Sequence, residues 1–83
     1  MVYALVWAPT VRDQLAALEK EVRARLIAKA VEASDAPHHY LERLSGHKLW
    51  KLRAGDYRAI IELDDAGKRM VVLKAGHRKN IYQ

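Results

Sequence analysis

The chain has 83 residues, no cysteine and a formal net charge of +5. This length suits a single domain, residues 1–83, and the lack of cysteine excludes disulfides and thiolate metal ligands. No run approaches the roughly 18 apolar residues of a membrane span, and the first residues lack the features of a signal peptide. We therefore expect a soluble cytoplasmic protein.

The positive charge lies in the second half of the chain. Residues 1–42 hold 5 Lys/Arg and 6 Asp/Glu, whereas residues 43–83 hold 10 Lys/Arg and 4 Asp/Glu. A basic half favours a polyanion-binding face, because neutralising phosphates releases condensed counterions. The alternative is a solvated basic surface that only keeps the protein soluble.

The N-terminal half predicts a strand and two helices. Residues 2–7 form an apolar run, which predicts a strand buried on both faces or nearly so. Thr10, with Asp13 three residues later, resembles a capping box and predicts a helix start. The apolar stripe of this helix is Val11, Leu15 and Leu18.

A second helix is expected from Lys20 or Glu21 to the proline at position 37. Its apolar stripe comprises Val22, Leu26, Ile27, Ala30 and Val31. Residues 38–47 predict a polar connection anchored by Leu41 and Leu44. An adjacent pair of histidines in such a connection lacks the spaced ligands of a zinc site, so we predict no metal.

Residues 48–64 predict a hairpin around Gly55-Asp56, a favoured type II′ loop. The resulting register pairs Arg53 with Arg58 and Lys51 with Ile60. One face of the hairpin is then apolar and comprises Trp50, Leu52, Tyr57, Ala59, Ile61 and Leu63. The other face is basic.

A second hairpin is expected around a three-residue loop, 65–67, with Gly67 in the left-handed conformation. This register pairs Asp64 with Lys68 and Arg58 with Lys74. It points Val71, Leu73 and Ala75 to the core. The expected fold is α+β in the order β-α-α-β-β-β(-α), with two N-terminal helices packed on a small, mainly antiparallel four-stranded sheet.

Four cations are thereby expected on one face: Lys51, Arg53, Arg58 and Lys74. Arg53 and Arg58 are directly opposed, which destabilises a sheet and favours an anionic ligand. The alternative is that the long side chains splay into water. Gly76 is expected to end the last strand, and His77 to Tyr82 to form a tail or helical turn close to Arg58.

Metal-independent RNA cleavage by 2′-hydroxyl attack needs a base, cations at the phosphate and an acid. Guanidinium groups suit the phosphate. His77, Tyr82 or a lysine are candidates for proton transfer. The isolated glycines give no phosphate-binding loop or dinucleotide motif.

The runs WKLRAGDYR (50–58) and VVLKAGHR (71–78), with Ile81-Tyr82 near the end, resemble the RelE family of the RelE/ParE superfamily over the whole chain. The resemblance implies a toxin of a type II toxin–antitoxin system. It implies a ribosome-dependent endoribonuclease (mRNA interferase) that cleaves mRNA in the A site, inhibits translation and needs no cofactor. The implied partners are a cognate antitoxin and a 70S-type ribosome.

The resemblance also assigns residues by position. Lys51 matches a catalytic lysine, Arg58 and Arg78 match the arginines that hold the scissile phosphate, and Tyr82 matches a tyrosine proposed to activate the 2′-hydroxyl. Well-studied members have a second lysine where this chain has Leu49, and they have longer tails, so His77 is an alternative base. The residues expected to bind RNA are Lys48, Arg53, Lys74 and Lys79.

Two other functions fit the same sequence. One is a ParE-like inhibitor of DNA gyrase, and the other is a catalytically silent basic RNA-binding module.

Overall fold

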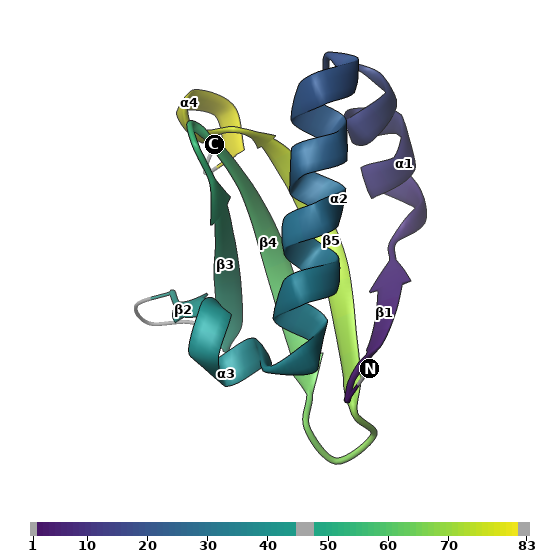
Figure 1. The fold of residues 1–83 in the computed structure, drawn as a ribbon, viewed down its shortest axis with the longest axis vertical. Coiled ribbons are helices and arrows are strands. Elements are labelled where there is room, and N and C mark those ends of the chain that lie inside the picture. Colours follow the sequence, from purple (N-terminus) through teal and green to yellow (C-terminus); the bar gives the residue numbers. More distant parts are fainter. Residues whose placement is uncertain (1, 45–47, 82–83) are drawn as a thin grey trace.

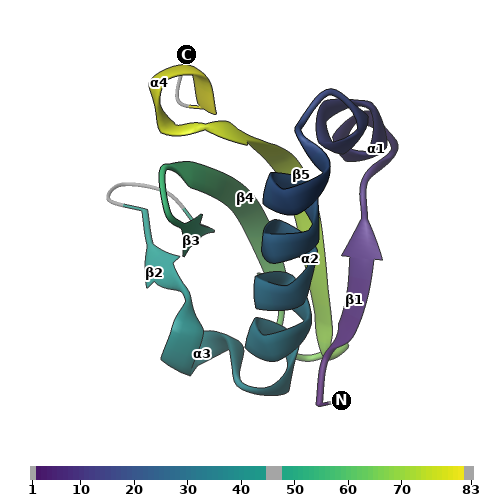
Figure 2. The same cartoon turned by 45° about the horizontal axis from the view of Figure 1, so that its top comes forward.

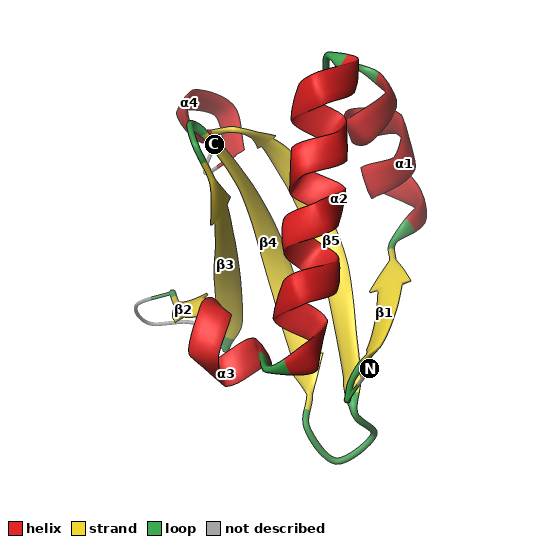
Figure 3. Ribbon diagram, in the orientation of Figure 1, coloured by secondary structure: helices red, strands yellow, loops and turns green. Residues whose placement is uncertain are grey.

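The computed structural model describes residues 2–44 and 48–81, and in this part of the chain five strands form one sheet. The elements are β1 (Ala4–Trp7), α1 (Pro9–Ala16), α2 (Lys20–Asp35), α3 (Pro37–Tyr40), β2 (Glu42–Arg43), β3 (Leu49–Ala54), β4 (Tyr57–Asp64), β5 (Arg69–His77) and α4 (Arg78–Ile81). The strand order is β1-β5-β4-β3-β2, and α2 lies along one face of the sheet (Figures 1 and 3). We call the opposite side of the sheet the open face.

The structure confirms the predicted α+β class and the mainly antiparallel sheet. Only β1 and β5 pair in parallel. The prediction of four strands was one strand short, because β2 has two residues and is too short to show an alternating pattern. The short helix α3 also lies in the region predicted as a polar connection, where Leu41 is buried as expected.

β1 is an edge strand. Leu5 and Trp7 pack against the buried core of the protein. Val6, in contrast, is 40% exposed, and Val2, just before the strand, is 58% exposed. The prediction that this strand is buried on both faces was therefore wrong. An apolar run does not reveal whether its strand lies at the centre or the edge of a sheet.

α1 begins at Pro9, and no side chain caps it. Proline suits the first helical position, because its missing N–H has no partner there in any case. The predicted capping box of Thr10 and Asp13 was therefore wrong. α2 begins and ends as predicted. Figure 2 shows α1 almost end-on beside the start of α2, so the two are separate helices.

The core lies between α2 and the sheet. The helix contributes Leu26, Ala30 and Ala33, all at most 2% exposed. The sheet contributes Leu52, Ala59, Ile61, Met70, Val72 and Ala75. Ile27 and Val31, predicted as part of the apolar stripe, are instead 38% and 42% exposed.

The β3–β4 hairpin has the predicted register throughout, including the opposed pair of Arg53 and Arg58. Gly55 has a φ of +61°, and Asp56 has no positive φ. This combination fits the type II′ turn, in which only the first central residue is left-handed. The turn therefore requires glycine at position 55.

The predicted β4–β5 register was wrong. Asp64 pairs with Arg69, so the loop has four residues, 65–68, and Lys68 rather than Gly67 has a positive φ (54°). A Cβ on Gly67 would lie 2.5 Å from Asp64 Oδ2, so a larger residue here would displace the Asp64 carboxylate. The Asp64 carboxylate also accepts a hydrogen bond from the Gly67 N–H.

A β-bulge at Leu73 shifts the pairing again. Val72 pairs with Ile61, but Lys74 pairs with the next residue along β4, Ile60. A bulge places two residues opposite one and reverses the faces of the residues that follow.

The bulge decides which residues of β5 face the core. Before it, Met70 and Val72 are fully buried, so the predicted core positions of Val71 and Leu73 were wrong. After it, Ala75 is buried as predicted. The extra loop residue and the extra bulge residue together restore the predicted alternation.

β5 continues through Gly76 to His77, so the prediction that Gly76 ends the strand was wrong. α4 follows and contacts both β4 and β5. A Cβ on Gly76 would lie 3.9 Å from Ile81 Cδ1. Ile60 and Ile81 are buried without belonging to the main core, which indicates a second, small apolar area beneath α4 on the open face.

Candidate functional site

The register places the four predicted cations on the open face. Lys51 and Lys74 both lie opposite Ile60, and Arg53 lies opposite Arg58. These side chains alternate with the core-facing residues of the same strands. Lys74 pairs with Ile60 rather than with Arg58, yet it keeps the predicted face.

Arg58 folds over the β3–β4 turn. Its Nη1 donates hydrogen bonds to the carbonyl oxygens of Gly55 (2.6 Å) and Tyr57 (3.0 Å). These bonds use two of the five N–H donors of a guanidinium and fix its position. The turn geometry therefore determines where this cation lies.

Arg78 is attached to the same turn. Its backbone N–H donates to the carbonyl oxygen of Asp56 at 2.8 Å. Arg58 and Arg78 are 20 positions apart in the sequence, yet one two-residue turn positions both. We call them the turn arginines.

Lys51 forms an ion pair with Glu42 on the neighbouring strand β2, with 3.6 Å between Nζ and Oε2. The two residues are directly opposed in the β2–β3 ladder. The Lys51 side chain is 29% exposed and the Glu42 side chain 60%. Glu42 was not predicted as a site residue, because the two-residue strand β2 that carries it was not predicted.

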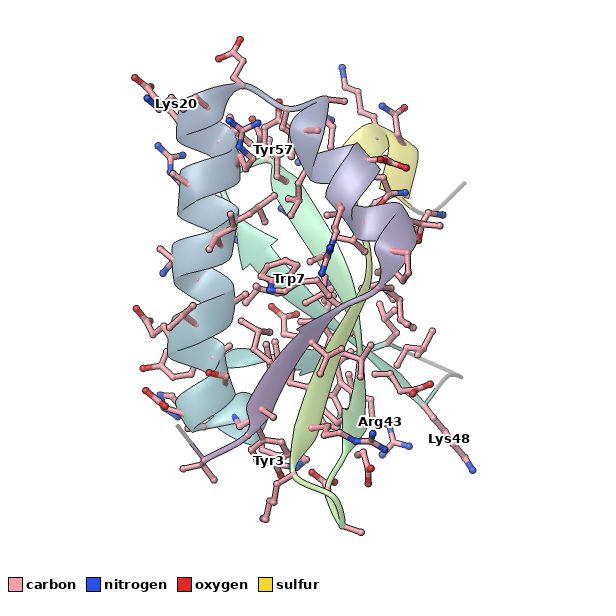
Figure 4. All side chains as sticks on the ribbon, turned by 90° about the vertical axis from the view of Figure 1, so that its right-hand side faces the viewer. Tyr3, Trp7, Lys20, Arg43, Lys48 and Tyr57 are labelled. Atoms are coloured by element: carbon pink, nitrogen blue, oxygen red, sulfur yellow. The ribbon has the colours of Figure 1, made fainter. Side chains whose placement is uncertain are left out.

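His77 faces the other side of the sheet. It lies opposite Tyr57, and the two rings meet edge to face with centroids 5.2 Å apart. Tyr57 packs against the main core and lies between α2 and the sheet in Figure 4. The structure thus brings together Lys51 and Arg58 on the open face and places the His77 ring on the helix-facing side.

The remaining predicted residues lie further out. Lys48 is exposed at the opposite end of β3 from the turn, and Figure 4 shows it on the far side of the sheet from α2. Lys79 is exposed on α4. Tyr82, the proposed activator of the 2′-hydroxyl, lies outside the described residues.

A second polar cluster lies at the end of the molecule away from α4 (Figure 1). Asp65 Oδ1 accepts hydrogen bonds from the Tyr3 hydroxyl (2.6 Å) and His38 Nε2 (2.9 Å). Lys68 Nζ lies 5.1 Å from the centroid of the Tyr3 ring. This cluster joins the N-terminal segment, α3 and the β4–β5 loop and does not adjoin the turn arginines.

Among residues 2–44 and 48–81, no three His, Asp or Glu side chains are grouped so as to hold a metal ion. The helices within the same ranges are too short or too polar to cross a membrane.

Solved structures of RelE toxins have this architecture. A chain of the RelBE2 toxin–antitoxin complex from Mycobacterium tuberculosis is 25% identical, with a TM-score of 0.84 over 94% of this chain and 100% of that chain. A double arginine-to-alanine variant of Escherichia coli RelE is 26% identical, with a TM-score of 0.79 over 95% and 86% of the two chains. A chain of the archaeal RelE–RelB complex from Pyrococcus horikoshii, 24% identical, shares the fold with a TM-score of 0.81 over 96% and 99%.

The fold is therefore that of a RelE/ParE superfamily toxin. The family of ParE toxins of type II toxin–antitoxin systems, parDE, matches residues 5–82. The chain belongs to this family and is a toxin of a type II toxin–antitoxin system. No curated protein is significantly similar to it in sequence.

Proposed function

We propose that this toxin is a ribosome-dependent endoribonuclease that cleaves mRNA in the A site by attack of a 2′-hydroxyl on the adjacent phosphate. Its cleavage would require no metal and would stop translation. The observation that carries the proposal is the attachment of both turn arginines to the Gly55-Asp56 turn. The turn thus fixes the Arg58 guanidinium and the Arg78 backbone at one edge of the basic face. Guanidinium groups suit a phosphate that gains negative charge in the transition state.

The other cations extend this surface. Lys51 is the lysine that would stabilise charge or transfer a proton at the phosphate, and Tyr82 remains the expected activator of the 2′-hydroxyl. Arg53 and Lys74 share the open face and would hold the RNA backbone. Lys48 and Lys79 would contact it more peripherally.

The proposed partners are a ribosome carrying mRNA and a cognate antitoxin. Structures similar to this chain include toxin–antitoxin complexes, which supports an antitoxin partner. An acidic, amphipathic segment that orders on contact would complement the basic half of the chain.

The test is to induce expression and map the 5′ ends of messages. The wild-type chain is expected to stop growth and to cut messages in codon register. Arg78→Ala is expected to lower cleavage by about 10²- to 10³-fold, as loss of a charge-stabilising donor does elsewhere. Arg12→Ala removes an exposed arginine of α1 and is expected to leave cleavage unchanged. Intact messages in cells that express the wild type would contradict the nuclease function.

A second candidate function is inhibition of DNA gyrase, which the match to the ParE toxin family favours. The experiment that separates the two is a supercoiling assay with purified gyrase. Inhibition of supercoiling without message cleavage would support this second function. A chain that binds RNA with an affinity that falls steeply with salt, but neither cleaves messages nor inhibits gyrase, would instead be a catalytically silent binding module.

A further inference from the structure

His77 occupies the junction between β5 and α4. Its Nδ1 accepts a hydrogen bond from the Lys79 backbone N–H at 3.2 Å. α4 begins at Arg78, so His77 is the residue just before the helix and Lys79 is its second residue. A side chain that accepts the N–H two residues further along is an N-cap.

The ring of His77 is held on the helix-facing side of the sheet, away from Arg58. Its contact with Tyr57 anchors it toward the main core. Its neighbour Gly76 lies opposite Arg58, on the open face. Because Nδ1 accepts a hydrogen bond from the Lys79 backbone N–H, a neutral ring in this arrangement carries its proton on Nε2.

We propose that His77 is a positioning residue, which caps α4 and fixes Arg78 beside the turn, and that it is not the general base of cleavage. This inference rests on the proposed nuclease function. A general base must reach the proton that it abstracts. The bound RNA would lie on the open face, whereas the imidazole stands on the helix-facing side.

The backbone around Arg78 supports this role. The Arg78 N–H bonds to Asp56, and the Lys79 N–H bonds to the His77 ring. The two bonds tie consecutive amides of the first turn of α4, one to the β3–β4 turn and one to β5. Loss of the ring removes the second bond and leaves Arg78 less firmly placed.

The experiment compares His77→Asn with His77→Ala. Asparagine is a good N-cap but has no imidazole that could act as a base. We expect His77→Asn to cleave messages on ribosomes within about three-fold of the wild type and with the same pH profile. We expect His77→Ala to lose about ten-fold in cleavage and to exchange the Lys79 amide hydrogen roughly five-fold faster, as the loss of an N-cap predicts.

His39→Ala is the matched control, because it removes an exposed histidine of α3 and is expected to change neither readout. If His77→Asn is as inactive as the alanine variant while its Lys79 amide stays protected, the imidazole itself is required and the proposal is overturned. Unchanged Lys79 exchange in His77→Ala also overturns it. If His77→Ala does not fold, the activity and pH profile of His77→Asn decide alone.

The experiment distinguishes failure of the nuclease function from failure of the capping role of His77. A wild-type chain that cleaves no message contradicts that function, and the Lys79 amide exchange then still upholds or overturns the capping role of His77.

Discussion

Lys51 is the one predicted catalytic residue for which the structure shows a carboxylate partner among the described residues. Glu42 reaches it only because β2 places the two side by side at the sheet edge. A phosphate on the open face would compete with this carboxylate for the same ammonium. If the proposed nuclease function holds, Glu42 is therefore expected to act as an internal counterion that weakens RNA binding.

Glu42→Gln is accordingly expected to tighten binding of a single-stranded RNA oligonucleotide by about two- to five-fold at low salt, the scale of an exposed ion pair. Fluorescence anisotropy measures this affinity. Glu32→Gln, an exposed position on α2, gives the same change in net charge on the other side of the sheet. An equal gain in Glu32→Gln, or a gain that persists in a Lys51→Met background, would contradict the role of the ion pair.

At the scale of elements, a side chain of α1 bonds to the backbone of β5 just beyond the bulge. β1 ends at Trp7, which pairs with Val72, so the rest of β5 lacks a partner strand on that side. The Ala75 N–H donates instead to Gln14 Oε1 of α1 at 2.8 Å. One side chain thus satisfies a backbone donor that the short edge strand leaves unpaired.

We expect Gln14→Ala to lower the free energy of unfolding by about 1–3 kcal/mol, the cost of leaving a buried donor unsatisfied. Urea denaturation measures the change. Asp13→Ala alters the adjacent, exposed position of α1 and serves as the control. A Gln14→Ala variant as stable as this control would show that water replaces the amide without loss.

At the scale of the whole molecule, the cluster around Asp65 joins three distant parts of the chain. The Tyr3 hydroxyl, and then His38, lower the pKa of Asp65 by hydrogen bonding to its carboxylate. The same bond to Asp65 raises the pKa of Tyr3. Folding therefore favours the ionised aspartate and the neutral tyrosine.

The sign of the pH dependence follows from these directions. The contribution of Asp65 to the free energy of unfolding is complete above the ordinary aspartate pKa of about 4. It is lost as the pH falls through the lowered pKa of Asp65 in the folded protein. The contribution of Tyr3 to the free energy of unfolding is complete below about pH 10. It is lost as the pH rises through the raised pKa of Tyr3 in the folded protein. We expect Asp65→Asn to flatten both limbs of a plot of the urea midpoint against pH.

Asp64→Asn is the control for this prediction. The pKa of Asp64 is lowered by the Gly67 N–H and then by Arg69, with no tyrosine partner. Its substitution is expected to flatten the acid limb only. An alkaline limb that persists in Asp65→Asn would contradict the role of the Tyr3–Asp65 bond.

Local sequence was sufficient to predict the strand register wherever the turn residues and the alternating apolar pattern agreed. Gly55-Asp56 sets the β3–β4 register, and that register alone places Lys51, Arg53 and Arg58 on one face. The second hairpin was misplaced, because Lys68 takes the left-handed position usually left to glycine. Lys74 kept its predicted face only because the bulge at Leu73 offset the longer loop.

The sequence by itself determined the α+β class, α2, the first hairpin and the basic face, since each depends on periodicity and turn chemistry over a few residues. The tertiary structure alone decided the β5 register, the pairing of Glu42 with Lys51 and the side of the sheet on which His77 lies. A bulge and a two-residue strand have no period of their own. They form only when helices, neighbouring strands and α4 pack against them, so contacts between distant segments fix the final arrangement around the turn arginines.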